Sequence, residues 1–292
     1  MQSTSSSSTS IMEVEFDNRN SRELPFDKET RNFPRQVANA IFSKCQPTPV
    51  VAPDLIACSV DALELLGIKV ADNQAAANPK SLSSEAKKTL QEYFSGNKLL
   101  PGCEPYAHVY CGHQFGNFAG QLGDGAAISF GHVVNEPTSW ELQLKGAGLT
   151  PFSRTADGRK VLRSSVREFL ASEAMHFLRI PTTRAATLVT STSTVMRDPF
   201  YDGNALDEKC TIVSRIAPNF FRFGSFEIFK KDGSRKGPSP GNERLKEELL
   251  DHVVDYYFET ADLKNEAKYA DFYTQIVKST AELVARYVNA YI

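Results

Sequence analysis

Five of the chain's seventeen glycines lie in one stretch of eighteen residues, HVYCGHQFGNFAGQLGDG, from 108 to 125. Gly112, Gly116, Gly120 and Gly123 recur every three or four residues, and Gly125 follows two residues later. Glycine allows backbone conformations and close approaches that a Cβ atom prevents. The stretch therefore suits a loop whose amides reach a phosphate, a tightly packed irregular segment, or a metal-binding knuckle.

A lysine at the end of an expected strand follows this stretch. Residues 126–134 predict a strand, residues 135–139 predict a hairpin connection, and WELQLK at 140–145 alternates between apolar and polar residues. Lys145 therefore ends a strand and lies on its polar face. The alternation predicts two faces, one formed by Trp140, Leu142 and Leu144 and the other by Glu141, Gln143 and Lys145.

The clearest helix, residues 163–179, carries a carboxylate within reach of this lysine. Glu168 follows Lys145 by 23 residues, and a helix packed beside a small antiparallel sheet can bring two such side chains together. A cation held by a carboxylate beside a loop of exposed amides is typical of phosphate binding, and of the small lobe of protein kinases. The helix is predicted from a capping-box pattern at 165–168, a stop at Pro181, and an apolar stripe formed by Val166, Phe169, Leu170, Ala174, Phe177 and Leu178.

Spacing alone leaves simpler interpretations open. Glu168 is also placed to cap its own helix, and Lys145 is equally consistent with a solvated strand end. Asp157-Gly158 is a good turn pair whatever else it does. Arg215 and Arg222 flank an apolar run, which fits surface charges, an ion pair or a polyphosphate site.

Other kinds of site fit the sequence less well. Cys103, His108, Cys111 and His113 gather four metal-ligand types within eleven residues, but their spacing is irregular and no second half closes a zinc tetrahedron. The chain contains no phosphate-binding P-loop motif, no complete G-x-G-x-x-G and no G-x-S-x-G nucleophile elbow. Zinc and hydrolase chemistry are therefore minor alternatives.

Composition excludes several classes of function. The net charge of −2 supplies no basic field for nucleic acid. The sequence contains no apolar run of about 18 residues, so we do not expect a transmembrane helix. Five scattered cysteines, an odd number, favour reduced thiols over a disulfide framework. The first twelve residues are rich in Ser and Thr and lack Lys and Arg, which fits neither a secretory nor a mitochondrial leader. We expect a disordered tail over residues 1–24.

Further elements follow from periodicity and punctuation. The last expected helix keeps its apolar spacing to the final residues, so we expect that the sequence stops inside a larger fold or that this helix docks terminally. A proline-rich, extended segment is expected over residues 25–56. Helices are expected at 60–66, 84–94, 243–260 and 267–291, strands at 184–191 and 210–217, and polar loops at 196–208 and 230–243.

Three segments of the sequence resemble one known family. CGHQFGNFAGQLGDGAA, ELQLKGAGLTPFSRTADGRKVLRSSVREFLASEAMHFLRIPTTRA and RIAPNFFRFGSFE are similar to the selenoprotein O family, also called YdiU-like proteins, and the likeness runs from about residue 14 to the end. The resemblance implies an α+β, protein-kinase-like (pseudokinase) fold. It places an extension at residues 25–100, an N-lobe of small antiparallel sheet and helix at 101–200, and the start of a helical C-lobe, incomplete within this sequence, at 201–292.

The resemblance also implies an activity, adenylylation of proteins. ATP would bind in inverted orientation with Mg²⁺, and AMP would pass to Ser, Thr or Tyr hydroxyls of protein substrates. No nucleic-acid partner, membrane insertion or oligomeric state is predicted. Residues are assigned by likeness to the family's motifs: Lys145 and Glu168 as the catalytic pair; Gly123, Gly125 and the following Ala126 in the first nucleotide-contacting turn; Asp157 and Gly158 in the second; and Arg215 and Arg222 at the γ-phosphate.

The sequence departs from the family pattern in two places. Many relatives have an Arg after Gly-Asp-Gly where this chain has Ala126, so the nucleotide site of this chain has one cation fewer. The family's catalytic segment, similar to HGVMNTDN, and its later metal-binding Asp do not occur, so the predicted metal ligands are none and we expect residues 1–292 alone to be inactive. A non-catalytic nucleotide-binding or interaction isoform and an ordinary protein kinase are the alternative functions. The family implies a mitochondrial location, with a cytoplasmic one as the alternative.

Overall fold

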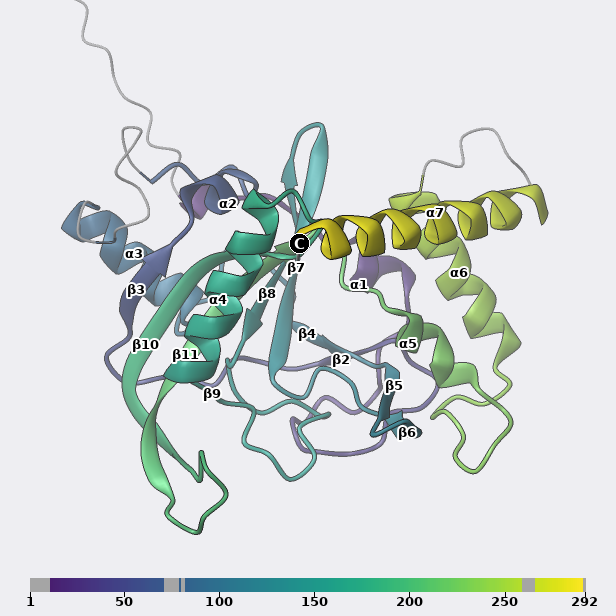
Figure 1. Cartoon of the computed structure of the whole chain (residues 1–292), viewed down its shortest axis with the longest axis horizontal. Helices are drawn as coiled ribbons and strands as arrows, with labels where there is room; N and C mark the ends of the chain where they lie inside the picture. The colour runs from purple at the N-terminus through teal and green to yellow at the C-terminus, as the bar shows by residue number, and fades with distance from the viewer. Residues whose placement is uncertain (1–10, 71–78, 80–81, 259–265, 291–292) are drawn as a thin grey trace, which may run out of the picture.

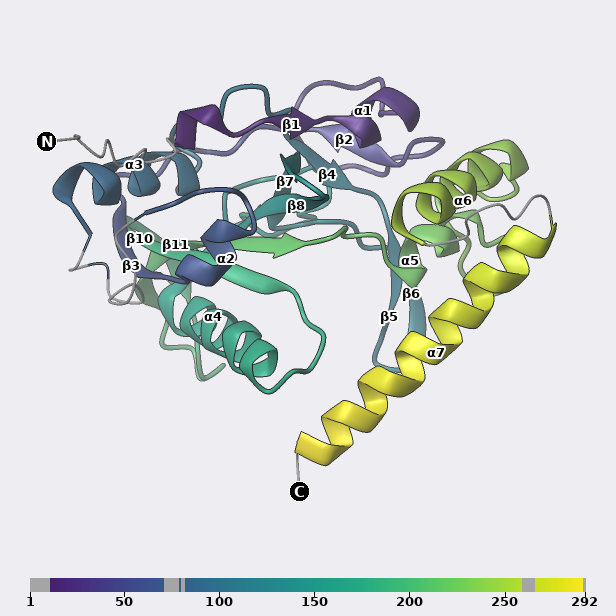
Figure 2. The ribbon, with the colours of Figure 1, turned by 90° about the horizontal axis from the view of Figure 1, so that it is seen from above.

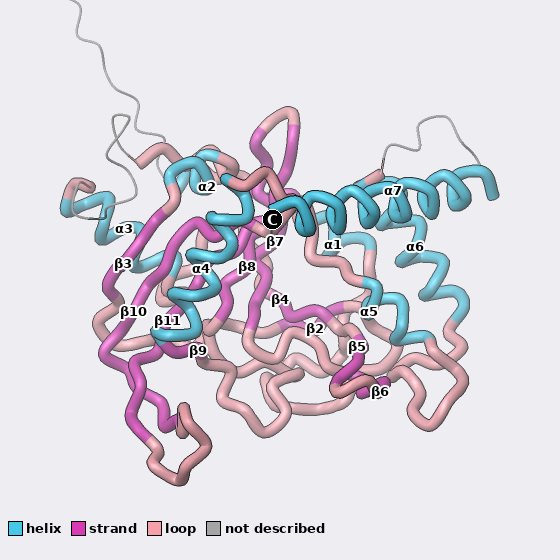
Figure 3. The backbone as a smooth tube through the Cα atoms, viewed as in Figure 1, coloured by secondary structure: helices cyan, strands magenta, loops and turns pink. Residues whose placement is uncertain are grey.

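A computed structural model describes residues 11–70, 79, 82–258 and 266–290. Its centre is an antiparallel sheet in the order β2-β4-β7-β8-β11-β10-β3, with β1 added beside β7 and β9 beside β11. A separate hairpin, β5–β6, lies toward the helical part of the molecule (Figure 1). Figure 3 shows most of the strands on one side of the molecule, with α3 and α4 beside them, and α5, α6 and α7 on the other side. The predicted α+β class is confirmed.

The strands differ greatly in length. The longest pair, β10 and β11, forms a hairpin that extends well beyond the rest of the sheet (Figure 1). The strands are β1 Phe16–Asp17, β2 Phe42–Lys44, β3 Asp54–Cys58, β4 Tyr106–His108, β5 Cys111–Gln114, β6 Asn117–Gln121, β7 Ala127–Asn135, β8 Thr138–Lys145, β9 Lys160–Val161, β10 Arg184–Arg197 and β11 Leu206–Ala217.

The helices fall into two groups. α2, α3 and α4 pack against β3, β10 and β11, whereas α5, α6 and α7 follow the sheet in sequence and lie to one side of it (Figure 2). The α-helices are α1 Arg19–Glu23, α2 Val60–Glu64, α3 Ser84–Phe94, α4 Leu162–Phe177, α5 Phe223–Phe226, α6 Glu243–Tyr257 and α7 Glu266–Ala290, and the 3-10 helices are η1 Ile11–Glu13 and η3 Glu227–Phe229.

Local signals explain several of these boundaries. The side chain of Ser83 accepts a hydrogen bond from the backbone of Ala86, which begins α3, and Asn242 caps α6 in the same way. Gly67 follows α2 with φ of +69°, a conformation that glycine adopts without strain. The expected hairpin at 135–139 is present, because β7 and β8 pair directly up to Asn135 and Thr138.

Residues 11–24 correct the prediction of a disordered tail. They form η1, β1 and α1, and Ile11, Asn20 and Leu24 are buried. β1 adds to the sheet beside β7. These residues are ordered because their apolar and amide side chains are covered by the sheet and by α6, contacts that lie more than 80 residues away in sequence. Residues 1–10 lie outside the described part of the chain.

The sheet also crosses the expected domain boundaries. β2 and β3 come from the segment 25–100, and β11 comes from the segment 201–292, yet all three pair within one sheet. The boundary predicted at 200/201 falls in the loop of the β10–β11 hairpin. The helical part therefore begins after β11, at the linker formed by residues 218–222 that leads into α5.

The prediction for α4 is right in position and wrong in part about its buried face. The residues of α4 that the structure buries are Ser165, Phe169 and Glu173, whereas Leu170 and Phe177 are exposed. No side chain caps its start, so the capping-box interpretation of residues 165–168 is also wrong. The face that meets β10 and β11 is narrower and more polar than the apolar stripe suggested.

α7 packs less closely than the other long helices. None of its residues is buried, and apolar side chains such as Tyr273 and Val284 are exposed. Near its end, Nη1 of Arg286 donates a hydrogen bond of 3.0 Å to the carbonyl oxygen of Arg179, which follows α4. Among the described residues, no helix is long and apolar enough to cross a membrane.

Candidate functional site

The ion pair expected between strand and helix is present. β8 ends at Lys145, and α4 packs across β10 and β11 so that Glu168 reaches it. Nζ of Lys145 lies 3.0 Å from Oε1 and 2.9 Å from Oε2 of Glu168. Burial and the neighbouring Arg215 lower the pKa of Lys145, and Glu168 opposes this shift. The carboxylate therefore stabilises the charged form of a half-buried ammonium and fixes its direction.

Arg215 joins the same carboxylate. It lies on β11 beside β8, and its Nε is 3.4 Å from Oε1 of Glu168. Its Nη1 donates to Oε1 of Gln143 at 3.1 Å, and its guanidinium lies 5.1 Å from the ring centroid of Phe220. Glu168 thus bridges two cations, and one of them is clamped from three sides.

Arg222 and a buried acid complete the cluster. The guanidinium of Arg222 lies 4.8 Å from the ring centroid of Tyr110. Asp124, which is 4% exposed, has a pKa raised to about 6 by burial, against the opposing charges of Arg222, Arg215 and Lys145. The carboxylate of Asp124 thus interacts electrostatically with all three cations.

The Gly123–Gly125 turn borders this region, because Ala127 pairs with Lys145 across the sheet. A Cβ atom at Gly123 would lie 2.3 Å from the Phe152 ring, and one at Gly125 would lie 2.8 Å from the Phe152 carbonyl oxygen. Both glycines are thus required by close packing, whether or not their amides also face a ligand.

Hydrogen bonds hold this first turn against its neighbours. The hydroxyl of Thr150 donates to the carbonyl oxygen of Asp124 at 2.7 Å, and that of Ser153 donates to Gly125 at 2.6 Å. The backbone carbonyl oxygen of Ala126 accepts a hydrogen bond from the amide of Gly146 at 2.7 Å, and the side chain of Ala126 is half-buried. The turn is therefore a rigid border of the cationic cluster.

The second expected turn, Asp157-Gly158, is placed differently. The Asp157 carboxylate accepts two hydrogen bonds from Arg197, of 2.7 and 2.8 Å, and one from the amide of Arg159. These bonds lower its pKa although burial opposes them. Gly158, with φ of +71°, packs so closely on Gly148 that a Cβ would lie 2.0 Å from that carbonyl oxygen. The turn borders the loop after Lys145, and in the described structure its carboxylate is committed to arginines outside the cluster.

The site residues assigned from the sequence omit three residues of the cluster: Tyr110, Asp124 and Gln143. Asp124 lies between two glycines that were assigned, and Gln143 lies two residues before Lys145. The alternation at 140–145 already predicted that Gln143 lies on the same strand face as Lys145, but it gave no reason to assign Gln143 to the site.

The four potential zinc ligands do not form a site. His108 is buried and its pKa is lowered to about 3 by burial, which keeps the imidazole neutral, whereas His113 is exposed and lies 3.7 Å from Glu227. Within residues 11–70, 79, 82–258 and 266–290, no group of three or more His, Cys, Asp or Glu side chains is placed to hold a metal ion. Magnesium likewise finds no ligand set there, because Asp124 is buried and Glu168 is already shared by Lys145 and Arg215.

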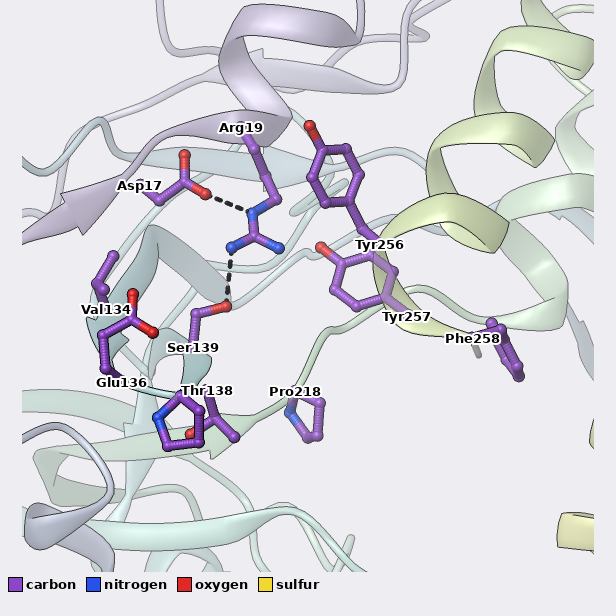
Figure 4. Close-up of a pocket in the computed structure, with 11 residues that line it drawn as sticks. Asp17, Arg19, Val134, Glu136, Thr138, Ser139, Pro218, Tyr256, Tyr257 and Phe258 are labelled. Carbon is purple, nitrogen blue, oxygen red and sulfur yellow. Dashed lines mark hydrogen bonds and ion pairs between the residues drawn. The ribbon is translucent and has the colours of Figure 1, made fainter. Parts of the chain in front are cut away.

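A cavity of about 590 Å³ lies near the opposite end of β8. Arg19 crosses it, donating to Asp17 at 2.7 Å and to Ser139 at 2.9 Å, with its guanidinium 4.8 Å from the ring centroid of Tyr256 (Figure 4). None of the residues assigned from the sequence lines it. Arg19 is already paired, and its contacts link the N-terminal segment to β8 and to α6. The cavity is separate from the Lys145 cluster.

The cluster can bind an anion. Lys145, Arg215 and Arg222 outnumber Glu168 and Asp124, and burial strengthens their attraction for a phosphate. The chain therefore provides cations held beside a rigid glycine turn, an arrangement whose charge suits an anionic ligand.

Comparison with known proteins gives one consistent family. Residues 59–291 match the family model described as "Protein adenylyltransferase SelO". The chain is 51% identical to mitochondrial protein adenylyltransferase SelO of Mus musculus and 49% identical to that of Homo sapiens, in each case over 94% of this chain and 42% of the relative. It is 48% identical to protein nucleotidyltransferase YdiU of Azoarcus, over 94% of this chain and 49% of the relative. The chain thus spans less than half the length of these relatives.

Proposed function

The chain belongs to the SelO family of protein adenylyltransferases, and we propose that its cationic cluster is the ATP site of an enzyme that transfers AMP to protein hydroxyls. The observation that carries the proposal is the placement of Lys145, paired to Glu168, beside Arg215 and Arg222. Three neighbouring cations attract the negative charge of a triphosphate, and the relatives that share this sequence are named for the transfer of nucleotides to proteins.

Each side chain has a role that follows from its position. Lys145 binds a phosphate oxygen, and Glu168 holds the ammonium in direction while keeping it protonated. Arg215 and Arg222 hold the γ-phosphate of an inverted ATP, which leaves the α-phosphorus accessible. The Gly123–Gly125 and Asp157-Gly158 turns border the nucleotide.

In the reaction, a Ser, Thr or Tyr hydroxyl oxygen bonds to the α-phosphorus while the bond from that phosphorus to the bridging oxygen breaks. Pyrophosphate leaves with the bonding electrons, and the hydroxyl proton passes to a base. Among the described residues no group of three or more His, Cys, Asp or Glu side chains is placed to hold a metal ion, so no step here is assigned to magnesium and none of these residues is assigned as the base. Residues 1–292 contain no segment similar to HGVMNTDN. We therefore propose that these residues alone bind nucleotide without transferring AMP.

The location is proposed from the relatives. The mouse and human proteins are named as mitochondrial, and we propose a mitochondrial location for this protein as well.

ATP labelled separately at the α- and γ-phosphates tests the activity. With the longest natural product that contains residues 1–292, α-label should enter acid-stable protein and γ-label should not. The reverse pattern would make the protein a kinase. Robust α-label transfer by residues 1–292 alone would contradict the proposal that they only bind nucleotide.

Nucleotide binding by the chain alone provides the second arm. We expect ATP to raise the melting temperature of residues 1–292, and adenosine to have a smaller effect because it lacks the phosphates. Stabilisation without label transfer would favour a nucleotide-binding role, and no stabilisation by either compound would remove the support for an ATP site.

A further inference from the structure

Arg215 owes its direction to two residues that the proposed function does not assign. Gln143 is its direct partner across β8 and β11, and Oε1 of Gln143 accepts from Nη1 of Arg215 at 3.1 Å. Gln143 is completely buried, so its amide cannot turn to water for other partners. The orientation of that amide therefore decides whether Arg215 meets an acceptor or a donor.

Asp124 fixes the orientation of the amide. Nε2 of Gln143 lies 3.4 Å from Oδ2 of Asp124, which also accepts from the backbone amide of His108 at 3.2 Å. An amide between a cation and an anion has one favourable direction, with its oxygen toward the guanidinium and its nitrogen toward the carboxylate. A flipped amide would place donor against donor at Arg215.

The Asp124 carboxylate is itself immobile. It is buried within the turn whose carbonyl oxygens are held by Thr150 and Ser153. Burial raises its pKa to about 6, so it is ionised at neutral pH and able to accept. Contacts thus run without interruption from the glycine turn through Gln143 to Arg215, and on to Glu168 and Lys145.

We propose that Asp124 and Gln143 are positioning residues that orient Arg215 for the terminal phosphate of ATP. The proposal rests on the proposed nucleotide site for its role in binding, and on the contacts alone for the orientation. Neither residue needs to touch the nucleotide. Their loss should weaken ATP binding through Arg215 and leave the rest of the site intact.

The test uses Gln143→Met, which keeps the length of the side chain and removes both hydrogen-bonding groups. Its matched control is Gln91→Met, because Gln91 donates a similar bond of 2.8 Å to Asp54 on the surface. The first readout is the Nη–H signal of Arg215 in ¹⁵N-labelled protein, identified by its loss in Arg215→Lys, because Nη1 is the atom that donates to Gln143. We expect its exchange with water to become at least fivefold faster in Gln143→Met and to be unchanged in the control.

The second readout separates positioning from general damage. We expect Gln143→Met to weaken ATP binding about tenfold and AMP binding less than twofold, since AMP lacks the terminal phosphates. In an Arg215→Ala background, the same substitution should change ATP binding less than twofold. Unchanged exchange of Arg215, equal losses for ATP and AMP, or a full effect in the Arg215→Ala background would each overturn the proposal.

Two provisions keep the outcomes separate. If Gln143→Met does not fold, Asp124→Asn gives the same test, because it removes the charge that orients the amide and should also speed exchange of Arg215. If the unaltered chain binds neither ATP nor AMP, the proposed function fails, and the exchange measurement still decides whether Gln143 and Asp124 orient Arg215.

Discussion

Glu141 and Lys145 lie on the same face of β8, four residues apart, in opposite surroundings. Lys145 is about a quarter exposed and shares its carboxylate partner with Arg215. Glu141 is 3% exposed and accepts hydrogen bonds from Ser129, Tyr106 and the amide of Phe220. One end of the strand leaves charge available to a ligand, and the other encloses it.

The enclosed end is built from three distant parts of the chain. Asn20 donates to the hydroxyl of Tyr106 and lies 2.8 Å from Nε2 of His252, while Phe220 comes from the linker into α5. Glu141 thus fastens the N-terminal segment, the sheet and the linker to one carboxylate. The comparison teaches that one polar strand face can supply a binding group and a structural anchor, and that burial separates the two roles.

Among the substitutions that test this difference between the two ends of β8, Glu141→Leu should have the largest effect. Glu141→Leu would leave three buried donors without an acceptor, and we expect the free energy of unfolding to fall by about 3–5 kcal/mol. Urea unfolding followed by tryptophan fluorescence measures it. A loss below about 1 kcal/mol would mean that water reaches this end of the strand and that the two ends do not differ as described.

Lys145 should show the opposite balance. In Lys145→Met, we expect ATP binding to weaken about 30-fold, or about 2 kcal/mol, while the unfolding free energy changes by less than about 1 kcal/mol. The thioether fills the space of the alkyl chain, and Glu168 keeps Arg215 as a partner. Isothermal titration with ATP and urea unfolding measure the two quantities.

The matched control for this variant is Lys87→Met, since Lys87 forms a surface ion pair of 2.8 Å with Asp54. We expect it to change neither quantity appreciably. Equal losses of ATP binding in both variants would show that the Lys145 end is not special.

The sequence predicts the surroundings of Lys145 better than those of Glu141, because the contacts of Lys145 are closer in sequence than those of Glu141. The alternation at 140–145 and the 23-residue separation made a contact between Lys145 and Glu168 one of several interpretations, the family resemblance favoured it, and the structure contains it. The same alternation placed Glu141 on the polar face of the strand and gave no sign that this residue is buried. It is buried because residues 11–24 and the linker cover it, and both contacts are distant in sequence.

α4 illustrates the same limit. Its boundaries followed from periodicity, but Leu170 and Phe177 are exposed whereas Ser165 and Glu173 are buried. The hydroxyl of Ser165 meets Thr211, and Glu173 binds Arg184 at 2.7 Å. The buried face of α4 therefore differs from the face that hydrophobicity alone predicts, because polar residues with buried partners belong to it. Those partners lie on strands, and the periodicity of the helix does not reveal them.

The titration of Glu141 should also distinguish the two ends of β8, with a smaller effect on stability than Glu141→Leu. Burial raises the pKa of Glu141 to about 7 from an ordinary value near 4.5. The folded chain then binds more protons than the unfolded chain between these values, so this group's contribution to stability falls as pH rises from 4.5 to 7. Glu141→Gln lacks this titration.

We therefore expect the unfolding free energy of the original chain, minus that of Glu141→Gln, to fall by about 1 kcal/mol per pH unit across this window and to level off above pH 7. Urea unfolding at half-unit steps from pH 4.5 to 8.5 measures it. Burial lowers the pKa of the neighbouring His132 to about 3, so this imidazole stays neutral in the folded chain across the window and does not contribute to the difference. A difference that stays flat would mean that Glu141 keeps an ordinary pKa and is not enclosed.

The smallest expected effect is at the open end, where the cation pattern departs from the family. Ala126 follows the Gly123–Gly125 turn and is half-buried, so its side-chain position is partly open to solvent. In Ala126→Arg we expect ATP to bind about threefold more tightly at low salt, about 0.6 kcal/mol, because one more cation borders the phosphates. Ala126→Gln, of similar length and uncharged, should bind ATP as the original chain does. If both substitutions act alike, or if the gain survives high salt, the effect is not electrostatic, and the Lys145 end would then be selecting its ligand by shape instead of charge.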